Sequence, residues 1–269
     1  MKMKPGPAGP YENGVGIVAA QEHHSPLEQF RIEHIGGHLS LGGYDISFNN
    51  SALWMLIAVA AITVFMLIGI RKQAVVPGRW QALVEFLYDF VANMLKENVG
   101  SEGRKYFPWV FSIFMFVLFC NLFGLLPKSF TVTSHIIVTF ALAMMVFLIV
   151  TAIGFIRHGF HFLSFFVPKG APVWLLPLMI PIEVISYFIR PMSLSVRLFA
   201  NMVAGHVMLV VLGSFVLPLG LAGAYISGIV PVAAITAIIG LEFLIACLQA
   251  YVFTILTCIY LNDAVHMHH

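Results

Sequence analysis

The chain has 269 residues, of which 60% are hydrophobic and only 10% carry a charge. Soluble domains carry about 25% charged residues, so this composition excludes a soluble globular protein. Apolar runs of about twenty residues recur along the chain, which predicts an integral membrane protein without a separate soluble domain. The formal net charge of +2 indicates no class of partner, because it sums segments within the membrane and segments in water.

Residues 1–50 are expected to form a tail outside the lipid, because they combine prolines and several glycines with charged residues. The short apolar run at residues 15–20 is too weak for the core of a secretory signal, and an Arg- and Ser-rich transit peptide is missing. We therefore expect the inner (plasma) membrane of a bacterium. The mitochondrial inner membrane is less favoured, although a protein encoded in an organelle would also need no presequence.

The first membrane-crossing helix is predicted at residues 51–70, an uncharged run long enough to cross a hydrocarbon core about 30 Å thick. Residues 80–98 differ, because apolar side chains recur there at helical spacing among charged ones. This pattern predicts an amphipathic helix that lies at the membrane interface. Two further spans are predicted at residues 107–126 and 132–156.

Residues 171–261 carry almost no charge, and the Gly- and Pro-containing stretch 213–220 is their one obvious connection. Two helices over 172–212 and 219–261 would have about forty residues each and reach roughly 60 Å, twice the thickness of the bilayer core. Such helices have to tilt steeply or be broken. We expect an all-α integral membrane protein, with about five membrane-crossing helices and one interfacial helix in a single membrane domain, residues 51–269.

Positive charge is concentrated in the connection between the first two spans. This connection carries six basic residues: Arg71, Lys72, Arg79, Lys96, Arg104 and Lys105. The next connection has only Lys128, and the third has Arg157 and Lys169. The positive-inside rule therefore places residues 71–106 in the cytoplasm, the N-terminus outside and the C-terminus in the cytoplasm.

The final apolar tract contains a few polar side chains that lipid disfavours. Before Asp263, its charged residues are Glu183, Arg190, Arg197 and Glu242, accompanied by Asn201, His206 and Gln249. A charge near the middle of a bilayer costs about 2.5 to 3.5 kcal/mol on insertion scales. Four charges without a purpose are therefore implausible, and we expect each of them to have a partner or a function.

Helical spacing gathers most of these side chains on one face, because seven steps of 100° return within about 20° of the same direction. The residues close to this face are Glu183, Arg190, Arg197, Asn201 and Ala204. His206 falls near the opposite face of the same helix. Glu242 and Gln249 are again seven apart and form a polar stripe on the following helix.

Side-chain chemistry separates these residues into two groups. The guanidinium of Arg197 cannot be deprotonated in a protein, so Arg197 is a fixed positive charge and a poor proton carrier. Glu183, His206 and Glu242 carry carboxylate or imidazole groups, which bind and release protons. Because these groups lie on different faces, the pattern predicts two separate aqueous paths with a cation between them.

Structural interpretations are open for several of these residues. Glu183 and Arg190 could form an internal ion pair that only holds helices together. The small residues near Arg197, Ser193 among them, could allow close helix packing or equally the approach of another subunit. Asn121, alone in an apolar span, could make an interhelical hydrogen bond or line a water path.

The most specific segments are PIEVISYFIRPMSLSVRLFANMVAGH at 181–206 and LEFLIACLQAYVFTILTCIYL at 241–261, supported by FCNLFGLLP at 119–127. Together they resemble subunit a of the F-type ATP synthase, the stator half of a rotary motor in the membrane. The likeness extends from about Phe30 to Ala264. It implies a long, tilted pair of C-terminal helices, a ring of c subunits beside them, and a complex with peripheral-stalk b-type subunits and the remaining ATP synthase subunits.

The resemblance also implies a role for each polar residue. Arg197 matches the family's essential arginine, which faces the ring and draws a ring carboxylate into its ionised state. The implied outer proton path contains His206, Glu242, Gln249 and Asn121. The implied cytoplasmic path contains Glu183 and Ser193, and the residues near the arginine are Asn201 and Arg190.

The chain departs from the family's pattern at two positions in the implied outer path. Gly124 stands where some relatives have an acidic residue, and the segment 131–143 has His135 and no aspartate. The course of the outer path is therefore left open by the sequence.

These expectations define a function in which protons enter from outside, neutralise a ring carboxylate and leave toward the cytoplasm, while Arg197 prevents a direct leak. No GxxxxGK[ST] loop occurs, so we expect no nucleotide site and no catalysis by this chain alone. The His-rich residues 266–269 are interpreted as a solvated tail, and we expect no metal, cofactor or nucleic acid. Sodium as the coupling ion is a variant.

Two other classes of function are kept beside this one. A self-contained ion-coupled transporter would use Glu183, Arg197 and Glu242 as a substrate site and predicts inverted repeats, which the sequence does not display. It also predicts activity of the purified chain alone. A purely scaffolding protein would tolerate the loss of the charge on Arg197.

Overall fold

The computed structural model describes residues 40–41, 44–45, 49–71, 77–126, 131–167, 173–221 and 225–266. Side chains are described for residues 49–71, 77–126, 131–162, 167, 174–214 and 232–266. The tail predicted at residues 1–50 lies almost entirely outside the described residues, as do residues 267–269 of the His-rich C-terminus.

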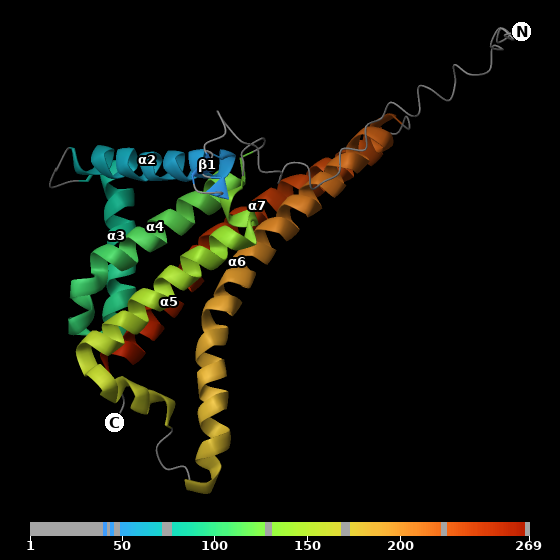
Figure 1. Ribbon diagram of the computed structural model, residues 1–269. Coiled ribbons are helices and arrows are strands. Elements are labelled where there is room, and N and C mark those ends of the chain that lie inside the picture. The colour runs from blue at the N-terminus through green and yellow to red at the C-terminus, as the bar shows by residue number, and fades with distance from the viewer. Residues whose placement is uncertain are drawn as a thin grey trace, which may run out of the picture.

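Six long helices form the described part of the chain (Figure 1). They are α2 (Asn50–Ile70), α3 (Arg79–Val99), α4 (Phe107–Gly124), α5 (Ile136–His158), α6 (Leu176–Leu221) and α7 (Tyr225–Val265). A small antiparallel pair of strands, β1 (Ser40–Leu41) and β2 (Tyr44–Asp45), precedes them. Short 3-10 helices lie between them: η2 (Ser101–Tyr106), η3 (Val132–Ser134), η4 (Gly159–Phe166) and η5 (Val173–Leu175).

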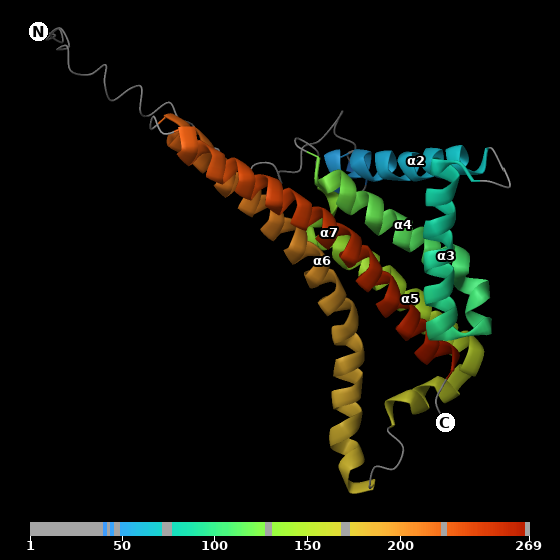
Figure 2. The same cartoon turned by 180° about the vertical axis from the view of Figure 1, so that it is seen from behind.

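Five of the six helices are long and apolar enough to cross a membrane, and α3 is the exception. The predicted fold class is thereby confirmed. Figures 1 and 2 show α3 running across α2 instead of alongside it, the arrangement expected for an interfacial helix beside a spanning one. One side of α3 is buried in the core, including Val91 and Leu95, while Trp80 and Phe86 are exposed. Its position at the interface stays a prediction.

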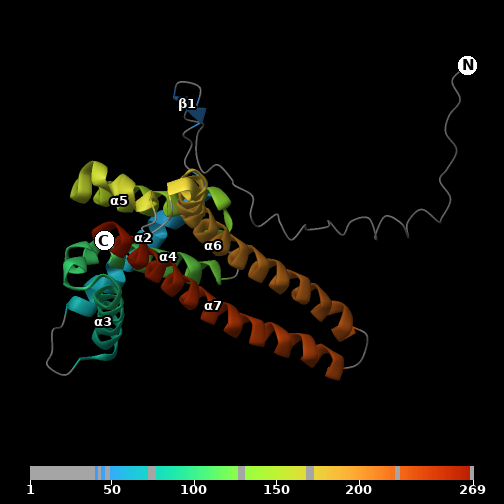
Figure 3. The same cartoon turned by 90° about the horizontal axis from the view of Figure 1, so that it is seen from below.

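The two C-terminal helices are continuous, and the later part of α6 lies beside α7 in all three views (Figures 1 to 3). The N-terminal part of α6 bends away from α7 in Figures 1 and 2. α6 has 46 residues and α7 has 41, so each is roughly 60 to 70 Å long. The connection expected at 213–220 is not a break, because α6 continues to Leu221. Glycine and proline are tolerated in membrane helices, where neighbouring groups satisfy the freed backbone. Interior prolines such as Pro191 also allow the curvature of α6 visible in Figure 1.

The core forms where α7 packs against α3, α4, α5 and α6. Large side chains of α4 and α7, including Phe114 and Phe253, are almost completely buried there. Asn121 and Gln249 are buried in the same region, although both are polar. The core therefore holds α6 and α7 in place and encloses two of the residues predicted to form a proton path.

Gly69 fixes the contact between α2 and α3, because a Cβ there would overlap the side chain of Val84. We expect Gly69→Ala to lower the stability of the detergent-solubilised protein by about 1 to 3 kcal/mol, the usual cost of overpacking. Gly240→Ala is the matched control, since Gly240 also lies inside a helix and a Cβ there meets nothing within 4 Å. Thermal unfolding measures both variants, and equal midpoints would contradict this account of the α2–α3 contact.

Candidate functional site

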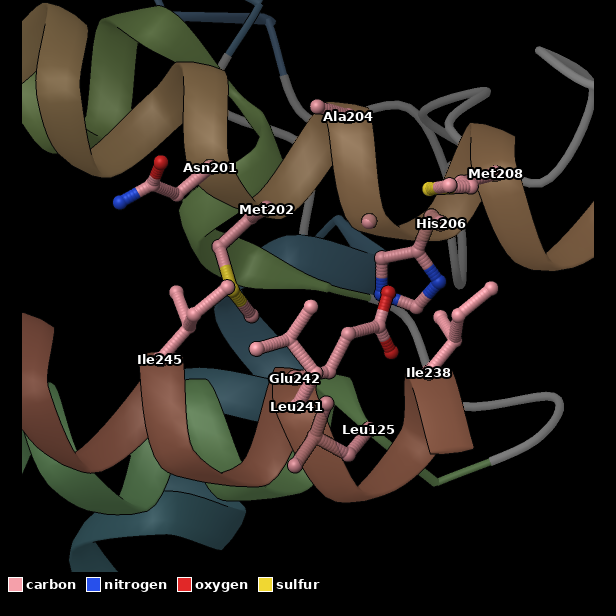
Figure 4. Close-up of a pocket in the computed structure, with 11 residues that line it drawn as sticks. Leu125, Asn201, Met202, Ala204, His206, Met208, Ile238, Leu241, Glu242 and Ile245 are labelled. Carbon is pink, nitrogen blue, oxygen red and sulfur yellow. The ribbon is translucent and has the colours of Figure 1, made fainter. Parts of the chain in front are cut away.

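A cavity of about 170 Å³ lies between α6 and α7 (Figure 4). Its lining is Leu125, Asn201, Met202, Ala204, Gly205, His206, Met208, Ile238, Leu241, Glu242 and Ile245. His206 and Glu242 are the two titratable residues of this lining. Figure 4 shows the imidazole of His206 and the carboxylate of Glu242 pointing toward one another across the cavity. The structure thus brings together two residues that the sequence placed on different helices.

The carboxylate of Glu242 is buried, with 9% of the residue exposed. Neither of its oxygens has a hydrogen-bond partner within the described part of the chain. Gly205 faces it from α6, and a Cβ at this position would overlap the carboxylate. A buried charge without a partner is strongly unfavourable, so this carboxylate needs a bound proton or water in the cavity. Either condition suits a group that exchanges protons.

The imidazole of His206 is held by the segment that follows α4. Oγ1 of Thr131 lies 2.8 Å from Nε2 of His206, and the backbone of Gly124 also hydrogen-bonds to the imidazole. Gly124 is the last residue of α4 and has no side chain. The absence of a side chain leaves room there for Thr131 and Met202, whose atoms would clash with a Cβ.

Further along the helix pair, polar side chains connect α7 to both neighbours. Nδ2 of Asn201 donates to Oε1 of Gln249 at 3.0 Å, which joins α6 to α7. Nδ2 of Asn121 donates to the carbonyl oxygen of Ala246 at 3.4 Å, which joins α4 to α7. The interhelical hydrogen bond considered for Asn121 is therefore present. One polar atom each of Asn121 and Gln249 is buried without a partner among the described residues.

Arg190 joins the same two helices nearer the C-terminus of α7. Its guanidinium lies 3.0 Å from the carboxylate of Asp263 and stacks on Tyr187 and Tyr260, 5.6 and 5.2 Å from their ring centroids. Glu183 makes no ion pair in the described part of the chain, so a Glu183–Arg190 pair is not what holds these helices. Asp263 is the ion-pair partner of Arg190, in the place that the sequence analysis considered for Glu183.

Arg197 lies on an exposed face of α6 between these two connections. Within the described residues its guanidinium has no hydrogen bond and no ion pair. Arg197 itself is exposed, as are Val196 beside it and Ser193 and Ala200 one turn away on either side, whereas Leu194 and Leu198 are buried. The charge is thus directed away from the core of this chain.

The predicted site residues fall into separate places along the helix pair. His206 and Glu242 share the cavity, Asn201 lines its edge and pairs with Gln249, and Arg197 lies apart on the surface. Glu183 is half-buried and Ser193 is exposed on α6, and neither lines the cavity.

Sequence reasoning missed Thr131 and Asp263. Thr131 belongs to no periodic pattern, so the sequence does not indicate that it contacts another segment. The position of Asp263 beyond the last apolar run suggests only a charge in contact with water. Their importance comes from partners 75 and 73 residues away.

Residues 52–262 match the family described as ATP synthase A chain. The ATP synthase subunit a of Paramagnetospirillum magneticum is 57% identical over 247 residues, which cover 91% of this chain and 99% of the relative. That of Rhodospirillum rubrum is 55% identical over 245 residues, covering 91% and 100%. That of Pelagibacter ubique is 53% identical over 245 residues, covering 91% and 99%.

The chain belongs to the ATP synthase subunit a family. The resemblance carried by the segments at 181–206 and 241–261 is therefore confirmed. The family match spans all five candidate membrane-crossing helices, so this is a multi-pass membrane protein with bacterial relatives. The match covers the chain as a whole and assigns no role to an individual residue.

Gly205 offers a test of the Glu242 position in the assembled ATP synthase. We expect Gly205→Ala to displace the carboxylate of Glu242 and to lower ATP-driven proton pumping about tenfold or more, because small misplacements of reacting groups have large effects on rate. Gly213→Ala on the same helix is the control, since its Cβ meets nothing within 4 Å. Pumping is measured per assembled complex, and native rates in both variants would contradict the importance of this contact.

Proposed function

We propose that this chain provides two offset half-channels that load and unload the carboxylates of a rotating c-ring, with Arg197 separating the two channels. As subunit a, it is the proton-translocating stator subunit of an F-type ATP synthase and has no catalytic activity alone. The proposal concerns which residues form each path and what holds the paths apart.

The observation that carries this proposal is the exposed, unpaired guanidinium of Arg197 on a membrane-crossing helix. Arginine stays charged in proteins, and a charge near the bilayer centre is costly without a partner. The described residues supply no carboxylate to it, and the proposal assigns that partner to another subunit. A carboxylate of the c-ring fits this requirement in charge and in location.

The surface around Arg197 supports close approach of a ring helix. Ser193, Ala200 and Ala204 are exposed on the same helix and have small side chains. Small residues let helix backbones approach closely in membranes. A ring carboxylate could then reach the guanidinium without displacing bulky groups of this chain.

The cavity between α6 and α7 supports the outer path. His206 and Glu242 meet in it, and Gln249 and Asn121 continue the polar region toward the middle of the helix pair. Glu183 and Ser193 belong to the opposite half of α6, beyond Arg197. The positive-inside rule predicts that the 71–106 connection is cytoplasmic, and the proposal places the N-terminal half of α6, with Glu183 and Ser193, on that side.

In this mechanism a proton enters through the cavity and neutralises a ring carboxylate, which can then move into lipid as the ring turns. When the carboxylate returns near Arg197, the fixed cation favours its ionised form, so the proton leaves by way of Glu183. The same cation repels protons that would pass directly between the channels. The chain is proposed to lie in a bacterial inner membrane with its N-terminus outside, beside b-type stalk subunits and the remaining subunits.

The transporter alternative receives no support from the site geometry. It requires Glu183, Arg197 and Glu242 to surround one substrate. Only Glu242 of these three lines the cavity between α6 and α7, and Arg197 lies on an exposed surface. The arrangement favours a subunit that works against an external ring.

The proposal is tested by Arg197→Ala in membrane vesicles that contain the assembled complex. We expect ATP-driven proton pumping to be lost, because the two paths are no longer separated. Val196→Ala is the control, since it changes the neighbouring exposed side chain without removing a charge. Co-purification of the ring and the catalytic sector reports assembly, and full pumping by the assembled Arg197→Ala complex would overturn the proposal.

A further inference from the structure

Buried hydroxyl groups gather where the chain passes from α4 to α5. Thr131, Thr133, Ser134 and Thr139 are each no more than 4% exposed. Of these, Thr131 is the residue whose hydroxyl reaches His206, with Oγ1 2.8 Å from Nε2. Thr131 belongs to the connection between α4 and α5 and not to the helix pair α6–α7. Its hydroxyl nevertheless contacts His206, a titratable residue that lines the cavity of this pair.

The position of Thr131 is fixed by its own surroundings. Oγ1 of Thr131 lies 3.5 Å from the carbonyl oxygen of Gly124, and Oγ of Ser134 donates to the carbonyl oxygen of Thr131 at 2.6 Å. A Cβ at Gly124 would overlap Cγ2 of Thr131, so the glycine permits this approach. The hydroxyl is therefore held beside the imidazole by the backbone of a tight segment.

A hydroxyl suits a proton-exchanging imidazole better than a carbonyl does. Neutral imidazole has one donor and one acceptor nitrogen, and the protonated ring has two donors. A hydroxyl both donates and accepts, so Thr131 can stay bonded to Nε2 of His206 in either state by rotating its proton. The carbonyl oxygen of Gly124 can only accept. Thr131 thus keeps the ring oriented while a proton arrives or leaves.

The other groups around His206 fit this role. Glu242 of α7 is the one other titratable side chain in the cavity lining, and it faces the imidazole in Figure 4. Gly124 and Thr131 carry no charge, and Arg197 lies nine residues away along α6. The imidazole therefore has Glu242 on one side and Thr131 on the other.

We propose that Thr131 is a positioning residue of the outer proton path, whose hydroxyl keeps the His206 imidazole directed toward Glu242 in both protonation states. This inference rests on the proposed role of His206 and Glu242 in that path. It extends the path from the helix pair α6–α7 to the connection between α4 and α5.

The test is ATP synthesis by the complex in liposomes, driven by an imposed pH step, with the pH varied in the compartment that the outer path faces. Thr131→Val removes the hydroxyl and keeps the shape, and Thr131→Ala is a second hydroxyl-free variant. Thr131→Ser restores the hydroxyl. Thr139→Val is the matched control, because Thr139 is a buried threonine of the same region that bonds to Ser195 instead of His206.

The expected result is a roughly fivefold lower rate for Thr131→Val and Thr131→Ala at equal assembly, the weight of one net hydrogen bond in an equilibrium. The pH at half-maximal rate is expected to move to lower pH, because the hydroxyl bonds more strongly to the charged imidazolium than to neutral imidazole, and its loss disfavours the charged form more. Thr131→Ser is expected to recover both properties, and Thr139→Val to keep the native profile. A merely structural role would lower assembly and leave the pH profile of the assembled complexes unchanged.

His206→Ala separates failure of this inference from failure of the proposed function. If His206→Ala lowers synthesis while the hydroxyl-free variants keep the native rate and profile, Thr131 is not a positioning residue and the outer path stands. If His206→Ala also keeps the native rate, the imidazole does not carry protons, and both the inference and the outer path are overturned.

Discussion

The structure depends on one constraint, a permanent positive charge that has to be kept on a membrane-crossing helix. The guanidinium of Arg197 lies on the exposed side of α6 and finds no carboxylate in the described part of the chain. Lipid alone cannot accommodate such a group at low cost. The exposed face of α6 around Arg197 is therefore suited to contact with a negatively charged partner. The other polar contacts of α6 hold this face in position.

Two polar connections between α6 and α7 bracket Arg197 along the helix. The Arg190–Asp263 ion pair lies on one side and the Asn201–Gln249 hydrogen bond on the other. Each uses a side chain on α6 within seven residues of Arg197. Each connection pairs a side chain of α6 with one of α7, so both hold the two helices together without supplying a partner to Arg197 within the described residues. The cavity begins at Asn201 of the second connection, and Glu242 lies about two turns from Gln249 along α7.

Much of this architecture is predictable from sequence, for reasons that particular residues make clear. Uncharged runs give the spans, and the segment around Arg197 is specific enough to indicate the family. The end of α6 was not predictable, because Gly213 and Pro218 suggest a turn while the helix continues to Leu221. The contacts of Thr131 and Asp263 were not predictable either, since they depend on segments that are distant in sequence and meet only after packing.

The most direct test of the central claim is passive proton flow through the membrane sector when the ring cannot turn. A cysteine at an exposed position of α7, such as Leu248, would be cross-linked to the ring after removal of the catalytic sector. With rotation blocked, the account predicts no proton flow when Arg197 is present and measurable flow in Arg197→Ala. Equally tight membranes in both cases would contradict the claim that this charge separates the two paths.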